Sequence, residues 1–328
     1  MSDDARDLVG SSLVWDNHAC MPLRPHDASF LPQLERCRRA GVNIVSLNVG
    51  FGDSGIEDHI RMLAQMRQWL GDRPDEYVIA GSVADIQHAR ASARLAVCFD
   101  IEGMRALGEQ ASLVRLYYEL GVRWMLVAYN TNNAAGGGCQ DDDPGLTRFG
   151  RDVIDEMTRA GMVVCCSHSG YRTAREAIEY CSRPVIFSHS NPRALWDHPR
   201  NIPDELMLAC AAKGGVVGIN GIGIYMGRND NSTAAIVRHI DYAVNLIGED
   251  HVGLGLDYVF DARELDEYMA SMTAIFPPEM GYGSGIAMIE PERITEIAAG
   301  LLEAGHSPAR IRKILGENFL RVAREVWR

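Results

Sequence analysis

Two histidines that follow similar apolar runs are the residues of this sequence best suited to carry chemistry. The runs Met162–Cys166 and Pro184–Phe187 each lead into a Ser-His pair, which ends in His168 and in His189. Between them, Thr173–Cys181 has apolar residues at helical spacing, so the stretch predicts a strand–helix–strand unit of a parallel sheet. Adjacent parallel strands would place both imidazoles at the edge where α/β proteins hold their active sites. Two neutral imidazoles there would form half of a zinc site, and the alternative is two unrelated histidines at strand ends.

Other polar residues stand at the ends of further predicted strands. The complete set is His18, Cys20, Glu102, Tyr129, Asn130, His168, His189 and Asp257. Glu102 could bridge two cations, with His18 and Cys20 on one ion and the two later histidines on the other. Two divalent ions about 3.5–4 Å apart would hold a hydroxide and polarise a carbonyl, which is hydrolytic chemistry. Asp257 would then transfer the proton.

Eight predicted strands alternate with predicted helices and must position these residues. The strands are Leu13–His18, Asn43–Val49, Leu95–Glu102, Trp124–Asn130, Met162–Cys166, Pro184–Phe187, Val216–Asn220 and Val252–Asp257. Their nearly continuous apolar runs are typical of a sheet that helices cover. Eight such units in strict alternation predict an α/β fold, a closed (β/α)8 TIM barrel. An open doubly wound sheet is the alternative, but no GxGxxG or Walker A motif supports nucleotide binding.

The connections between these elements predict one domain over residues 1–328. The helix Thr233–Ile247 has clear caps in Ser232 or Thr233 and in Gly248, and Ser307 followed by a proline begins one of two C-terminal helices. The long connection Phe260–Glu290, rich in Met, Pro and Gly, predicts a lid-like insertion near 260–290.

Composition limits the environment and the partners of the protein. The formal net charge is −12, so a basic nucleic-acid footprint is not expected. The N-terminus lacks the features of a signal peptide, and no apolar run approaches the roughly 20 residues of a membrane span. The 8 cysteines include Cys98, Cys165 and Cys166 inside apolar runs, which favours buried, reduced thiols. We therefore expect a cytoplasmic protein.

Several segments of the chain resemble, in their order, the motifs of one known family. They are WDNHACMPL, DIEG, GLTRFG, the two Ser-His turns, HPRNIPDE, KGGVVGIN, VGLGLDY and ILGENFLRV. Together they resemble the membrane (renal) dipeptidase family, the metallopeptidases of family M19, from about Val14 to the C-terminus. The resemblance implies a (β/α)8 barrel of the metallo-dependent hydrolase type, a binuclear zinc site and hydrolysis of dipeptides, often with a D-residue at the C-terminal position.

The resemblance also implies a role for each matching residue. In that pattern His18 binds one metal, His168 and His189 bind the other, and Glu102 binds both. Arg200 then holds the substrate carboxylate, and Asp257 is the acid/base group.

Three positions depart from the family pattern. The first motif, His-x-Asp in the family, is His18-Ala19-Cys20 here. Cys20 would be a softer zinc ligand as a thiolate, or a poor ligand that leaves one metal position empty. Tyr129 stands where the family has a histidine, and it could still donate a hydrogen bond to an oxyanion. Cys165 replaces an aspartate before the first Ser-His turn.

Structural roles compete with these functional roles. Arg200 could be a surface charge in a polar loop, and Asp257 could cap a helix. Cys20 could be a small buried residue, and Tyr129 could be a core aromatic with a locally satisfied hydroxyl.

The leading interpretation is zinc-dependent hydrolysis of a small amide bond, in a dipeptide, with one or two Zn²⁺ per chain. Asp257, Glu102 and Tyr129 would be catalytic, and Arg200, Tyr129 and Asn130 would contact the substrate. The alternatives are an amidohydrolase acting on an N-acyl or N-substituted amino acid, and a catalytically silent barrel that binds a metal or ligand. The expected partner is a small molecule or dipeptide, with no nucleic acid and no membrane; assembly as a homodimer stays open.

Overall fold

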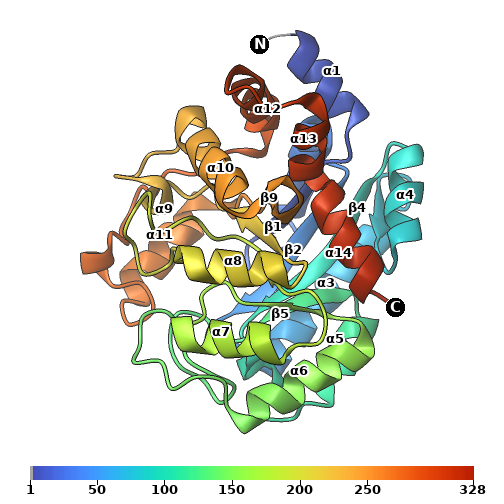
Figure 1. The fold of residues 1–328 in the computed structure, drawn as a ribbon. Helices are drawn as coiled ribbons and strands as arrows, with labels where there is room; N and C mark the ends of the chain where they lie inside the picture. The colour runs from blue at the N-terminus through green and yellow to red at the C-terminus, as the bar shows by residue number, and fades with distance from the viewer. Residues whose placement is uncertain (1–2) are drawn as a thin grey trace.

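A closed ring of parallel strands forms the centre of the molecule (Figure 1). The computed structural model describes residues 3–328 of the chain. The strands of the ring are β1 (Trp15–Cys20), β2 (Ile44–Phe51), β4 (Leu95–Glu102), β5 (Val122–Leu126), β6 (Val163–Cys165), β7 (Ile186–Phe187), β8 (Val216–Ile219) and β9 (Val252–Leu254). Each pairs in parallel with the next, and the pairing of Asp16 with Leu254 joins β9 back to β1. The predicted (β/α)8 barrel is confirmed, and the open doubly wound sheet is wrong.

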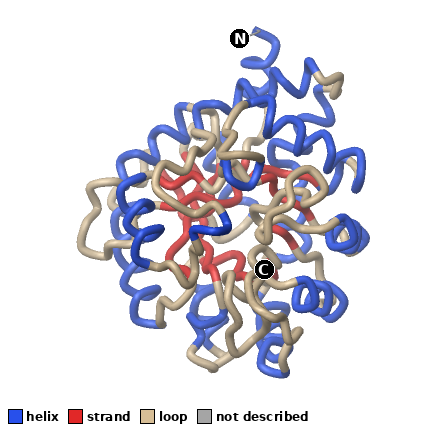
Figure 2. Tube along the Cα trace, turned by 90° about the vertical axis from the view of Figure 1, so that its left-hand side faces the viewer, coloured by secondary structure: helices blue, strands red, loops and turns tan. Residues whose placement is uncertain are grey.

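Helices surround this ring, as Figure 2 shows. They are α1 (Asp3–Ser11), α2 (Leu34–Arg39), α3 (Ile56–Gly71), α4 (Val83–Ala91), α5 (Leu113–Glu119), α6 (Arg148–Ala160), α7 (Tyr171–Tyr180), α8 (Asp204–Ala212), α9 (Gly223–Met226), α10 (Thr233–Ile247), α11 (Ala262–Ser271), α12 (Ile294–Glu303), α13 (Pro308–Arg312) and α14 (Asn318–Val326). The predicted caps begin two of them, because Ser232 accepts a hydrogen bond from the Ala235 amide and Ser307 accepts one from Arg310. Within residues 3–328, no helix combines the length and the apolar character that crossing a membrane requires.

The described part of the chain contains two strands and four helices that the sequence pattern does not predict. They are β3 (Tyr77–Ile79), β10 (Tyr258–Val259), α1, α9, α11 and α12. Strand β3 pairs with the first half of β4, whose second half pairs with β5, so one strand edge serves two partners. Strand β10 pairs with the end of β1. Two or three residues are too few for a strand to show a recognisable alternation.

The C-terminal helix α14 closes the end of the barrel at which the strands begin. Its apolar residues join the first residues of several strands in one buried cluster: Trp15, Ile44, Val163, Ile186, Val216, Phe319, Leu320, Val322, Ala323 and Val326. Gly253 on β9 leaves the space that Phe319 fills, since a Cβ at Gly253 would lie 2.4 Å from the Phe319 ring. The C-terminal helix is therefore part of the barrel core.

The segment 260–290 lies over the opposite end of the barrel. It begins with α11, and its side chains pack against the chain that follows β8 in a second cluster: Ile222, Ile224, Tyr225, Met269, Ile275, Phe276 and Tyr282. An antiparallel bridge between Ile222 and Met288 ties the end of the segment to the chain that follows β8. The segment that the sequence predicts as a lid-like insertion thus covers the strand ends where the candidate site residues stand.

Removing the Phe319 ring should destabilise the barrel. We expect Phe319→Ala to lower the free energy of unfolding by about 3–5 kcal/mol, because the substitution leaves a cavity in a closed core. Urea denaturation followed by circular dichroism would measure the change. Leu116→Ala is the matched control, because the Leu116 side chain is exposed, and it should change stability by about 0.5 kcal/mol or less. Equal effects of the two substitutions would contradict the proposed packing of α14.

Candidate metal centre

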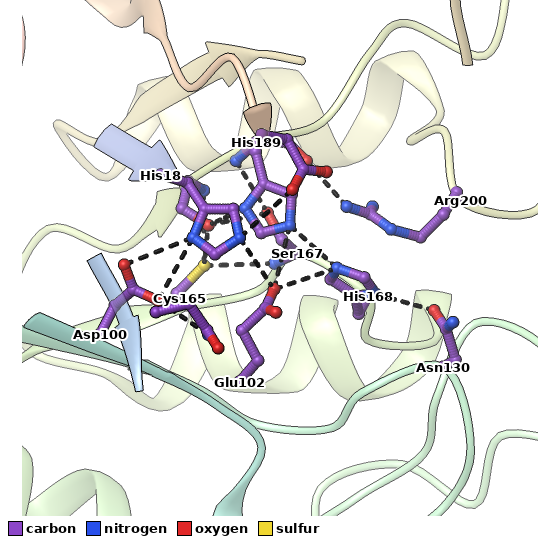
Figure 3. A network of polar contacts seen from close by, with 12 residues as sticks. His18, Asp100, Glu102, Asn130, Cys165, Ser167, His168, His189 and Arg200 are labelled. Carbon is purple, nitrogen blue, oxygen red and sulfur yellow. Dashed lines mark hydrogen bonds and ion pairs between the residues drawn. The ribbon is translucent and has the colours of Figure 1, made fainter. Parts of the chain in front are cut away.

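Glu102, His168 and His189 meet at the carboxyl end of the barrel (Figure 3). Glu102 is the last residue of β4, and the histidines follow β6 and β7. Glu102 Oε1 lies 3.2 Å from Nε2 of His168 and 3.2 Å from Nε2 of His189. The two Nε2 atoms are 2.8 Å apart. All three residues are buried, so their ligand atoms converge on one point that is shielded from water.

Hydrogen bonds behind the histidines fix which ring nitrogen carries the proton. His168 Nδ1 lies 2.7 Å from Asn130 Oδ1, which can only accept, so Nδ1 carries the hydrogen. His189 Nδ1 lies 2.7 Å from the Ser188 hydroxyl, which donates to Ser167 and is free to accept. Burial lowers the pKa of both histidines well below the ordinary value. Neutral rings protonated at Nδ1 direct their Nε2 lone pairs at the convergence point.

This arrangement fits a cation. Glu102 Oε1 is buried and has no hydrogen-bond donor among the described residues. Burial raises the pKa of Glu102 to about 8, which shows that the pocket disfavours its unpaired negative charge. Two lone pairs and a carboxylate oxygen that face one another without a hydrogen between them are the donor set of a divalent metal ion.

His18, which belongs to β1, adds a second set of ligand atoms beside the first. Its ring stacks on that of His189 at 4.1 Å, and its Nε2 lies 3.4 Å from Asp257 Oδ1 and 3.6 Å from Glu102 Oε1. Burial lowers the pKa of His18, but the negative charge of Asp100 and its other neighbours raise that pKa well above the ordinary value. His18, His189 and Asp257 together form a second group with the geometry of a metal site.

Asp100 holds the His18 ring from behind. Its carboxylate lies 3.2 Å from His18 Nδ1, and it also accepts hydrogen bonds from the Ser46 hydroxyl and the Asn48 amide. The sequence reasoning missed Asp100. Its position two residues before Glu102 was a usable signal, because residues i and i+2 of a strand lie on the same face.

Cys20 lies beside this second group. Its Sγ is 3.5 Å from His18 Nε2 and donates to Asp257 Oδ1 at 3.7 Å. Burial raises the pKa of the Cys20 thiol to about 12. The sequence prediction pairs Cys20 with His18 as the ligands of one metal, and the structure brings these two side chains together beside Asp257.

A left-handed backbone turns three of the site residues inward just beyond their strands. Asn130, His168 and Asp257 have φ angles of 55°, 61° and 60°. Residues other than glycine adopt this region rarely, and such strain is concentrated at functional sites. Strands β5 and β9 end at Leu126 and Leu254, before Asn130 and Asp257, where the sequence pattern predicts the strand ends.

Asp257 and Tyr129 line the cavity beside the cluster. The Asp257 carboxylate accepts a hydrogen bond from Asn220 Nδ2 at 2.8 Å, a contact that the sequence reasoning missed although Asn220 ends a predicted strand. The Tyr129 ring stacks on His168 at 4.1 Å, and burial raises the pKa of its hydroxyl well above the ordinary value. Both side chains therefore face the space next to the ligand atoms.

Arg200 and Asn130 occupy the same side of the cluster in different roles. The Arg200 guanidinium is buried and donates to the carbonyl of His189 at 2.9 Å (Figure 3), so it is no surface charge. Asn130 is predicted to contact the substrate. The structure instead uses both ends of its amide, on His168 and on the Ile275 carbonyl, so Asn130 orients a ligand.

A closed parallel barrel with buried histidines and carboxylates at its carboxyl end defines the amidohydrolase class of TIM barrels. An amidohydrolase structure from Pseudomonas aeruginosa matches it with a TM-score of 0.88 and 26% identity, over 98% of this chain and 99% of that one. Residues 35–268 match the membrane dipeptidase family, peptidase family M19, and the chain belongs to this family. The resemblance read from the sequence motifs is confirmed.

The chain is also similar to curated proteins. The chain is 32% identical over 279 residues to the uncharacterized protein in the pqqA 5′ region of Klebsiella pneumoniae. The match covers 81% of this chain and 95% of that protein. It is 34% identical over 211 residues to dipeptidase aclJ of Aspergillus oryzae. This second match covers 62% of this chain and 50% of the relative. The match thus spans about half the length of the fungal protein.

The convergence on Glu102 predicts that its charge is needed for metal binding. Glu102→Gln should lower the metal content per chain and the metal affinity by more than about a hundredfold, since an amide oxygen is a weak ligand. Mass spectrometry of the metal after dialysis against buffered Zn²⁺ would measure this. Glu109→Gln, at an exposed position, is the control and should bind metal normally. Full metal occupancy in Glu102→Gln would remove Glu102 from the centre.

The position of Cys20 predicts that its sulfur stays protonated beside the metal. The cobalt-substituted protein should show no sulfur-to-metal charge-transfer band in the near ultraviolet, because the thiol donates a hydrogen bond to Asp257 and burial raises its pKa to about 12. Cys20→Ser should keep the metal-to-protein ratio of the parent. A charge-transfer band that Cys20→Ser removes, and that Cys139→Ser keeps, would show instead that Cys20 is a thiolate ligand.

Proposed function

We propose that the protein hydrolyses the amide bond of dipeptides in a metal-dependent reaction. The observation that carries this proposal is the buried guanidinium beside the ligand cluster. Arg200 is 2% exposed, its Nε has no partner, and none of the carboxylates in residues 3–328 forms an ion pair with it. A buried cation without an anion is costly, so the site favours a ligand that brings a carboxylate. The free C-terminus of a dipeptide is such a group, and it would lie next to the metal centre.

Zinc is the metal that we propose for the centre, because imidazole and carboxylate are its usual ligands in hydrolases. Glu102, His168 and His189 would hold one ion. A second position would lie at His18, whose Nε2 is 3.6 Å from Glu102 Oε1 and 3.5 Å from Cys20 Sγ, which leaves Asp257 for proton transfer. A divalent ion held there supplies polarisation of the substrate carbonyl and a lowered pKa for bound water.

Asp257 and Tyr129 would perform the proton transfer and the charge stabilisation. As water adds to the carbonyl carbon, Asp257 accepts its proton, and Asn220 keeps that carboxylate aimed into the cavity. Asp257 then gives the proton to the amine as the C–N bond breaks, which releases two amino acids. The Tyr129 hydroxyl, which has no hydrogen-bond partner among the described residues, would donate to the negative charge that develops on the carbonyl oxygen.

A second candidate is hydrolysis of an N-acyl amino acid. Such a substrate also carries a carboxylate for Arg200, and the apolar side of the cavity favours an acyl group. The third reading of the sequence, a silent barrel, would bind the same ligands without turnover.

Release of free amino acids from a panel of L,L- and L,D-dipeptides tests the proposal, with N-acyl amino acids assayed in parallel. We expect dipeptide hydrolysis that a chelator abolishes and added Zn²⁺ restores. Hydrolysis of N-acyl amino acids alone would establish the second candidate. Binding of metal and of dipeptides without any turnover would establish the silent barrel.

Because Arg200 is unpaired, we predict that its removal lowers kcat/KM mainly for substrates with a free carboxylate. Arg200→Ala should lower kcat/KM by about tenfold to a hundredfold, because a charge-assisted hydrogen bond is worth about 1.5–3 kcal/mol. The loss should be largest for dipeptides with a free C-terminus and small for their amides. Arg228→Ala, at an exposed position, is the control. An equal loss for free and amidated substrates, at unchanged metal content, would contradict the assignment.

A further inference from the structure

One wall of the cavity above the metal centre is apolar. The cavity encloses about 750 Å³ of empty space, part of it open to solvent. Its floor carries Glu102, His168 and Asp257, and its apolar lining consists of Met21, Pro22, Leu23, Phe51, Tyr129, Ile222, Tyr225, Val259, Leu265, Tyr268, Met269, Phe276, Tyr282 and Ile286. Apolar linings bind ligands by burying their apolar groups.

The two acidic residues of this wall are already engaged by the protein. The Glu264 carboxylate accepts from the Leu23 amide at 3.0 Å and from the Tyr268 hydroxyl at 2.7 Å, and its second oxygen pairs with Arg24 at 2.8 Å. Asp261 pairs with the same guanidinium at 3.2 Å. These carboxylates therefore hold α11 against the loop after β1 and leave no unpaired charge for a ligand.

The lining also lacks a group that would attract an acidic ligand. No lysine or arginine lines the cavity among the described residues, while Glu102, Asp257, Asp261 and Glu264 all do. A negatively charged side chain would face like charges without a counter-ion, and a positively charged one would lose its hydration against apolar groups.

Arg200 lies at one end of the apolar lining, because its guanidinium is 5.4 Å from the centroid of the Tyr225 ring. Figure 3 shows Arg200 across the ligand cluster from His18, which belongs to β1. The part of the wall nearest β1 is built by residues that follow this strand, among them Leu23, and by α11, which Arg24 ties to them. A dipeptide whose carboxylate reaches Arg200 would thus direct its N-terminal residue towards the wall.

We propose that the enzyme selects dipeptides whose N-terminal residue has a bulky apolar side chain, and that Leu265 and its neighbours on α11 determine this selection. The inference rests on the proposed dipeptidase function. When the dipeptide binds, the apolar side chain of its N-terminal residue moves from water into contact with the wall. The C-terminal residue contributes its carboxylate, which binds Arg200.

Kinetics with a dipeptide series X-Ala, with X as Phe, Leu, Gly, Glu or Lys and with D- or L-alanine, test the proposal. We expect kcat/KM for Phe-Ala and Leu-Ala to exceed that for Gly-Ala by at least about tenfold, and that for Glu-Ala by about a hundredfold. Calorimetric binding of the same peptides to the metal-loaded protein should follow the same order. Equal values across the series, or a preference for Glu or Lys, would overturn the proposal.

A variant series separates the wall from the rest of the enzyme. Leu265→Ala should lower the ratio of kcat/KM for Phe-Ala to that for Gly-Ala by about tenfold, and Leu265→Lys should raise the relative rate with Glu-Ala. The ratio is independent of the fraction of active enzyme, so partial misfolding cannot produce the change. Glu267→Ala, on the exposed side of α11, is the control and should keep the parent ratio.

The proposal and the dipeptidase function fail in different ways. Tight binding of Phe-Ala without hydrolysis would refute the function and support the apolar site. Hydrolysis without selectivity, or unchanged ratios in both Leu265 variants, would refute the apolar site and leave the function standing.

Discussion

The buried charge of Glu102 is the constraint on which the rest of the site depends. Its carboxylate is 4% exposed at the centre of the barrel mouth, and burial raises its pKa to about 8. Its nearest neighbours, His168 and His189, are neutral and direct lone pairs towards it, so they cannot compensate the charge. A divalent cation would remove this conflict, because it attracts the carboxylate and both lone pairs at once.

The residues around the cluster keep the histidine lone pairs directed at the Glu102 carboxylate. Asn130 and Ser188 accept from the outer nitrogens of two histidines, and Asp100 faces the outer nitrogen of the third. Each contact keeps an Nε2 atom pointing inward, which is how second-shell groups orient metal ligands. The left-handed turns at Asn130 and His168 bring these partners together just beyond the strand ends. At the opposite end of the barrel, α14 packs against the first residues of the strands and so holds the strands that carry these side chains.

Sequence reasoning recovered the barrel, its alternation and the residues at the strand ends, because apolar runs and strand-end positions are encoded locally. It could not assign partners across strands. Asn130 was expected at the substrate and orients His168 instead, since the direction of an amide depends on a contact with Ile275, which is distant in sequence. Asp257 is predicted as an acid/base group at the same barrel face as His18, and the closed ring brings the two side chains within 3.4 Å, a contact that no local pattern encodes. Very short strands such as β3 and β10 carried too few residues for any pattern.

Charge balance connects the protonation of Cys20 with the number of ions in the centre. Asp100, Glu102 and Asp257 surround His18 and offer three negative charges when all are ionised. One divalent ion together with the buried Arg200 guanidinium would balance these three charges. A second divalent ion would leave two uncompensated positive charges in a buried site. A thiolate at Cys20 would supply one negative charge, whereas burial raises the pKa of this thiol to about 12 in the absence of a metal. With a neutral Cys20, the second ion needs an anion from solvent or substrate, so the state of this one side chain couples metal occupancy to ligand binding.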